Sequence, residues 1–156
     1  MKNSASMRFR IIFFLLTICM IAFAFIHSSM PSDISASESE GVMTVLQDIL
    51  NALGFSAELT DHIVRKAAHF TEYFAIGSLL MCCAYSLDRI KPYRYYSQIC
   101  FVGLATAVCD ETIQLNVPGR SGQITDVLLD FSGVLCGALV LLAVFTIYKN
   151  IKLKKL

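Results

Sequence analysis

Four apolar segments divide this sequence, and they constrain its fold more than any other feature. We place helices at residues 11–30, 66–87, 97–115 and 126–148. The last three approach the ~20 residues that a helix needs to cross about 30 Å of hydrocarbon. The composition agrees, because only 16% of the residues are charged, whereas soluble domains have about 25%. The sequence therefore predicts an all-α integral membrane protein, a four-helix bundle formed by a single domain over residues 1–156.

The first segment admits two interpretations. Its apolar core, residues 11–26, follows Lys2, Arg8 and Arg10, and a basic start before an apolar run is typical of a signal peptide. No A-x-A cleavage site follows His27, so we favour an uncleaved helix. The other three helices are arranged in the same way under either interpretation.

Residues 31–65 connect the first two helices, and they contain a second helical pattern. Six apolar residues recur at i, i+3, i+4, i+7, i+8 and i+11, on one helical face: Val42, Val45, Leu46, Ile49, Leu50 and Leu53. About twelve residues are too few to span a bilayer. We therefore expect a short extracytoplasmic amphipathic helix that lies on the membrane surface or caps the bundle. A helix that binds a partner protein has the same pattern.

Basic and acidic residues are segregated along the chain. Lys and Arg precede the first segment, occupy positions 89–94 after the second, and follow the fourth from Lys149 onward. Most charges in the loop 31–65 are acidic instead. Because an excess of Lys and Arg marks cytoplasmic segments, we expect both termini in the cytoplasm and this loop outside it. Arg65 and Lys66, at the outer mouth of the second helix, are the exception.

Polar residues reach one depth in three of the apolar segments. A charge inside a membrane helix costs about 2.5–3.5 kcal/mol on insertion scales, so such residues usually mark function. The set comprises Lys66, His69, Tyr73, Asp110, Glu111, Gln114, Asp126 and Asp130. Two basic residues just outside the segments, Arg65 and Arg120, adjoin it. Under the predicted topology all of them lie near the outer surface. We therefore predict one outward-facing polar site, in which Asp110 and Glu111 face a basic rim of Arg65, Lys66 and Arg120.

Ordinary structural explanations exist for each residue taken alone. His69 is a core histidine if it bonds Glu72 or Asp110, Arg120 a charge that reaches the interface, and Asp126 a carboxylate placed against a helix dipole. The six cysteines fall in apolar segments without a C-x-x-C pair, so we predict neither disulfides nor a zinc site from them. The sequence has no basic run suited to nucleic acid, and the lipid bilayer is the partner that the composition implies.

The ordered motifs resemble the VanZ-like family of membrane proteins over roughly residues 8–150. They are Lys66-x-x-His69-x-x-x-Tyr73, Asp110-Glu111-x-x-Gln114, Pro118-Gly-Arg120 and Asp126-x-x-x-Asp130-x-x-Gly133. The family pattern has Asn where Asp130 stands, which leaves the role of this extra carboxylate open. The resemblance implies a four-helix, multi-pass protein of the cell envelope, and the family's prototype is associated with low-level resistance to teicoplanin. It implies no established reaction or cofactor.

Three functions remain open for the site. In the first, it binds an envelope lipid, a lipid-linked wall precursor or a glycopeptide, with its Arg and Lys side chains on phosphate or carboxylate. In the second, the protein is a hydrolase or transferase acting on a lipid-linked phosphate, with His69, Asp110 and Glu111 as candidate catalytic residues; clustered acids also suit Mg²⁺, although we assign no metal. In the third, ion pairs only clasp the helix ends. The sequence has no G-x-S-x-G or H-E-x-x-H signature.

Overall fold

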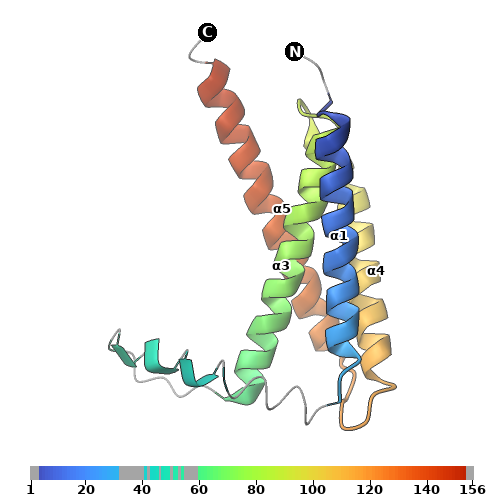
Figure 1. The fold of residues 1–156 in the computed structure, drawn as a ribbon, viewed down its shortest axis with the longest axis vertical. Helices are drawn as coiled ribbons and strands as arrows, with labels where there is room; N and C mark the ends of the chain where they lie inside the picture. The colour runs from blue at the N-terminus through green and yellow to red at the C-terminus, as the bar shows by residue number, and fades with distance from the viewer. Residues whose placement is uncertain are drawn as a thin grey trace.

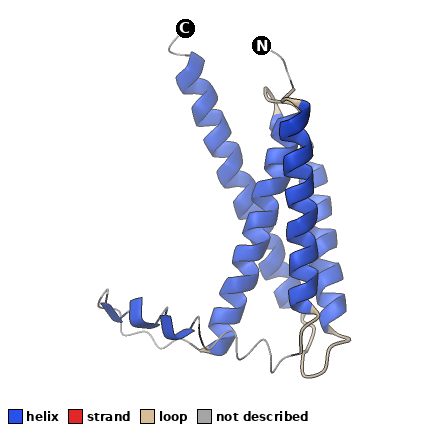
Figure 2. Cartoon of the chain, in the orientation of Figure 1, coloured by secondary structure: helices blue, strands red, loops and turns tan. Residues whose placement is uncertain are grey.

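The computed structural model describes residues 4–31 and 60–153, together with positions 41, 43–45, 47–49, 51–52 and 54. In this part of the chain all regular structure is helical (Figure 2). The elements, in chain order, are α1 (Met7–Ser28), α3 (Asp61–Leu87), the 3-10 helix η1 (Pro92–Tyr95), α4 (Tyr96–Gln114) and α5 (Ile124–Leu153). The prediction of an all-α fold is confirmed.

The long helices run side by side and alternate in direction (Figure 1). Both chain ends lie at one end of the molecule, and the α4–α5 connection lies at the other. Three helices, α1, α3 and α5, are long and apolar enough to cross a membrane. The 19-residue α4 packs beside α1 and α5 but carries Asp110, Glu111 and Gln114 near its end. The orientation and a fourth crossing stay predictions.

Each long helix begins before its predicted first residue, whereas only α5 ends beyond its predicted last residue. Local signals set the two ends of α3. The Thr60 hydroxyl accepts a hydrogen bond from the Ile63 amide, so α3 begins at Asp61, as an N-cap residue allows. At the other end of α3, the Asp88 carboxylate accepts hydrogen bonds from the amides of Ile90 (2.9 Å) and Lys91 (3.0 Å). These bonds form a side-chain turn in place of another helical turn.

The predicted amphipathic helix is described only in part. The described positions between 41 and 52 are helical, and Val45 and Ile49 are exposed. The remaining members of the predicted apolar face lie outside the described residues, so its docking surface stays a prediction.

Small residues let α3 and α5 approach until their backbones touch. A Cβ at Gly133 would lie 2.7 Å from the carbonyl oxygen of Phe70, and one at Gly137 would lie closer still to that of Phe74. From the other side, Gly77 of α3 meets the backbone of α5 in the same way. Such seams are typical of membrane helices, where close backbone packing replaces the hydrophobic effect.

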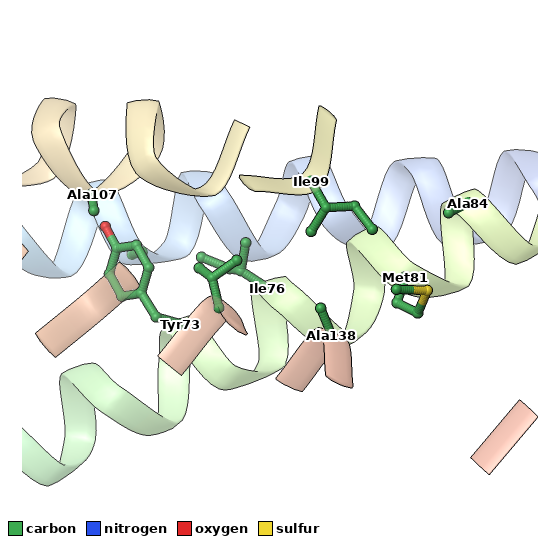
Figure 3. Close-up of a cluster of buried hydrophobic side chains, with 9 residues drawn as sticks. Tyr73, Ile76, Met81, Ala84, Ile99, Ala107 and Ala138 are labelled. Carbon is green, nitrogen blue, oxygen red and sulfur yellow. The ribbon is translucent and has the colours of Figure 1, made fainter. Parts of the chain in front are cut away.

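The apolar interior lies between the four long helices (Figure 3). It consists of Ala24, Tyr73, Ile76, Met81, Ala84, Ile99, Ala107, Val134 and Ala138. Large apolar side chains such as Ile18, Phe101 and Val144 are instead exposed on the outer faces. An extensive exposed apolar surface marks an interaction site or contact with a membrane, and here, on helices of this length, it indicates lipid contact.

Substitution of the seam glycines tests the α3–α5 contact. We expect Gly77→Ala and Gly137→Ala each to lower the free energy of unfolding by about 1–3 kcal/mol, because the added methyl group forces the helices apart. Gly41→Ala is the control, because its Cβ would meet nothing within 4 Å. The measurement is the unfolding temperature in detergent, followed by circular dichroism. Equal unfolding temperatures for all three variants would contradict the backbone contact.

Candidate functional site

A cavity of about 210 Å³ lies between α3, α4, α5 and the α4–α5 connection. The predicted site residues line it, except Tyr73 and Asp110, which are completely buried. The full lining is His62, Arg65, Lys66, His69, Glu111, Gln114, Gly119, Arg120, Ser121, Gln123, Asp126, Leu129 and Asp130. Residues far apart in the sequence, from His62 to Asp130, thus meet at one end of the molecule.

A tight turn carries Arg120 to the cavity. The Arg120 amide donates to the Val117 carbonyl oxygen at 3.2 Å, and Gly119 has a φ of 77°. Pro118 followed by a glycine with positive φ is typical of a type II turn. The turn directs the Arg120 guanidinium back toward α1, where it donates to the His27 carbonyl oxygen at 3.4 Å.

The cationic side of the cavity is incompletely paired. Lys66 of α3 forms an ion pair with Asp126 of α5, with 2.8 Å between Nζ and Oδ1. Neither Arg65 nor Arg120 forms an ion pair with any residue that the structure describes. Burial, and then the charge of Arg65, lower the pKa of Arg120 from its usual value, although a guanidinium stays protonated. Two neighbouring guanidinium groups without an ion-pair partner in the described part of the chain favour an anion between them.

Asp110 is held by side chains from two helices. Its Oδ2 accepts hydrogen bonds from Ser28 Oγ at 2.7 Å and from Gln114 Nε2 at 3.3 Å. The carboxyl group is completely buried, and its Oδ1 has no hydrogen-bond partner among the described residues. Because one oxygen is fixed by neutral donors, the direction of the other is also fixed.

Glu111 connects α4 to the beginning of α5. Its Oε1 accepts a hydrogen bond of 2.6 Å from the backbone amide of Gln123, the residue before α5. A carboxylate there is favourable, because the first amides of a helix lack partners within it. Glu111 Oε2 has no partner within the described part of the chain.

His69, Asp110 and Asp130, on three different helices, meet beside the cavity, whose wall includes His69 and Asp130. One potential ligand atom from each lies within 4.8 Å of the others. All three side chains are buried, with exposed fractions of 8%, 0% and 1%. In the described structure, His69 Nδ1, Asp110 Oδ1 and Asp130 Oδ1 all lack a hydrogen-bond partner. The predicted alternative of a core histidine bonded to Glu72 or Asp110 is therefore not formed.

Tyr73 belongs to the apolar core and lies one helical turn after His69 on α3. Its ring points from α3 toward Ala107 of α4 (Figure 3), and its hydroxyl donates to the Thr106 carbonyl oxygen at 3.5 Å. The side chain is completely buried, so it does not reach the cavity.

The sequence analysis missed His62, Ser121 and Leu129 of the lining, and it also missed the contributions of His27, Ser28 and Gln123. His27 Nδ1 lies 3.0 Å from Glu72 Oε1, and its ring stacks on that of His69 with 6.0 Å between centroids. His27 and Ser28 are polar residues at the C-terminal end of the first segment, a signal comparable to that of the other helices. Gln123 acts through its backbone, which no side-chain pattern could indicate.

A pair of substitutions tests the link between Glu111 and α5. Glu111→Ala leaves the Gln123 amide without an acceptor, and we expect it to lower the free energy of unfolding by about 1–3 kcal/mol. Glu111→Gln keeps an acceptor oxygen, so its loss is smaller. Thermal unfolding in detergent measures both. Equal losses for the two variants would show that the charge, and not the hydrogen bond, matters.

Comparison with known proteins identifies the family of this chain. No curated protein and no solved structure matches the chain significantly. A family model described as VanZ/LLP1 matches residues 13–146, which include the whole cavity lining and all the motifs that carried the resemblance. That match and three apolar helices long enough to cross a bilayer identify a membrane protein, and the chain belongs to the VanZ/LLP1 family.

Proposed function

We propose that the protein acts in the cell envelope by binding a small anionic group of an envelope lipid or lipid-linked wall precursor in the cavity. In doing so it changes susceptibility to glycopeptides such as teicoplanin. One observation carries the proposal: Arg65 and Arg120 line the cavity without an ion-pair partner among the described residues. A guanidinium presents parallel N–H donors that match the oxygens of phosphate or carboxylate.

The size of the cavity favours a headgroup over the antibiotic itself. Pockets that enclose drug-sized ligands measure about 300–1,000 Å³, and this one measures about 210 Å³. A phosphate or carboxylate with a few neighbouring atoms fits such a volume, whereas a glycopeptide would contact only the rim. The effect on teicoplanin therefore operates through the lipid or precursor.

The proposed orientation places the cavity at the outer face of the membrane, with α4 as a fourth crossing and both termini in the cytoplasm. Support comes from the basic residues near the two chain ends, such as Arg8, Arg10 and Lys152, because cytoplasmic segments carry this excess. The start of α1 and the end of α5 lie at the end of the molecule opposite the cavity (Figure 1).

The alternative functions have less support. A general base needs an orienting partner, yet the described histidine–carboxylate pair is His27 with Glu72, and it does not involve His69. A clasp depends on ion pairs, and the described pair across the cavity, Lys66 with Asp126, is partly exposed. Exposed pairs contribute about 0–1 kcal/mol, too little to hold the helix ends.

Resistance measurements test the arginines. In a teicoplanin-sensitive host, we expect wild-type protein to raise the inhibitory concentration, and Arg120→Lys to remove at least half of that increase at unchanged membrane yield. Lysine keeps the charge but loses the two parallel donors. Arg94→Lys is the matched control, because Arg94 lies in η1, outside the cavity lining. Parallel loss of yield and resistance would show that Arg120 supports the fold.

A binding experiment tests the anion directly. A long-chain prenyl phosphate should raise the unfolding temperature of purified wild-type protein, while the corresponding prenol should not. Arg120→Gln should reduce the effect, and Arg94→Gln should not. Equal stabilisation by phosphate and alcohol would contradict recognition of the anionic group.

A further inference from the structure

We propose that His69, Asp110 and Asp130 bind a divalent transition-metal ion, of the class of Zn²⁺, at the wall of the anion cavity. The proposal does not depend on the proposed function, because the metal can be measured without any anion. His69 comes from α3, Asp110 from α4 and Asp130 from α5, so the ion would connect three helices.

The geometry of the three side chains suits one ion. Their potential ligand atoms all lie within 4.8 Å of one another. Ligands that bind one Zn²⁺ at about 2.0–2.2 Å lie about 3–4 Å apart, so small side-chain rotations bring the three atoms to these distances. The helices need not move, because the seam of Gly77, Gly133 and Gly137 already holds α3 against α5.

Unpartnered polar atoms point independently to a missing ligand. Each of the three side chains is more than nine-tenths buried, and each has an atom without a hydrogen-bond partner in the described structure: His69 Nδ1, Asp110 Oδ1 and Asp130 Oδ1. Buried polar atoms are satisfied in the great majority of cases. Three orphaned atoms in one cluster are satisfied together by a single cation.

The charges around Asp110 and Asp130 also favour a bound cation. No described Lys or Arg forms an ion pair with Asp110 or Asp130. The nearest lysine on the cavity wall, Lys66, is paired with Asp126, and the Arg120 guanidinium reaches the His27 carbonyl oxygen. Buried carboxylates are normally paired or coordinate metals, and a divalent ion provides the charge that the protein does not.

The ligand types select the class of metal. Imidazole nitrogen suits Zn²⁺ and other transition metals, whereas a site for Mg²⁺ or Ca²⁺ uses oxygen ligands. One histidine with two carboxylates gives three protein ligands, which is the number in zinc sites that keep a position open for water or substrate. His69 and Asp130 line the cavity, so the open position faces an incoming anion.

A second layer of contacts orients Asp110. Ser28 Oγ and Gln114 Nε2 both donate to Oδ2 and leave Oδ1 for the ion. Such supporting hydrogen bonds typically change metal affinity by about 10–100-fold. Ser28 is therefore a positioning residue of the metal site, although it lies in α1, far from the three ligands in the sequence.

The test measures metal on the full-length protein purified in detergent. After removal of metal with a chelator, the protein is loaded with Zn²⁺ or Co²⁺, and the bound metal is determined by mass spectrometry. We expect about one ion per chain in wild type. Asp130→Asn and His69→Gln should lower the affinity at least about tenfold, and Ser28→Ala about tenfold. The spectrum of the Co²⁺ protein should lack a thiolate charge-transfer band, which separates this site from the cysteines.

Two control variants make the result specific. Asp126→Asn removes a carboxylate of the cavity outside the cluster, and Arg120→Gln removes the proposed anion contact; both should keep wild-type metal affinity. Asp130→Asn changes one atom, so it remains informative if His69→Gln does not fold. The proposal is overturned if wild type binds no ion, if cobalt shows thiolate ligands, or if Asp126→Asn loses as much metal as Asp130→Asn. Metal binding that survives in Arg120→Gln while the prenyl phosphate effect is lost separates the two proposals.

Discussion

The contact between α3 and α5 is the constraint on which the polar site depends. Gly133 and Gly137 allow the backbone of α5 to touch that of α3 at Phe70 and Phe74. Asp130 lies one turn before Gly133, and His69 directly precedes Phe70, so the contact that joins the helices also brings these two side chains together. A larger residue in the seam would separate the helices and leave two polar groups apart in an apolar interior, where each lacks a partner.

Much of the fold could be predicted from the sequence, because long apolar segments with few charges indicate membrane helices. The depth of the polar residues was also predictable, since 1.5 Å per residue converts a sequence position into a height along the helix. The rotation of each helix about its own axis could not be predicted, and neither could the hydrogen-bond partner of each polar side chain. Asp110 and Glu111 are adjacent, yet one bonds Ser28 of α1 and the other the amide of Gln123. Their expected basic partners line the cavity without pairing to them.

Asp130 adds a second carboxylate to the buried cluster of His69 and Asp110. With Asn at position 130, the buried cluster would contain one carboxylate and one histidine, and an amide could donate to either. With Asp130 the cluster has two carboxylates, and neither forms an ion pair with a described Lys or Arg. Asp at position 130, in place of Asn, therefore changes a neutral hydrogen-bonding position into one that requires a proton or a metal ion.

The hydrogen bond from Ser28 to Asp110 makes the site depend on the N-terminal helix α1. On α1 the buried residues are Thr17, Ala24 and Ser28, so few side chains anchor this helix, and the last of them ends at the buried carboxylate. A peptidase that removed α1 would take away one of the two described donors to Asp110 and uncover the side of α4 that Ser28 protects. Loss of this helix would therefore leave Asp110 with fewer hydrogen-bond donors in an apolar interior.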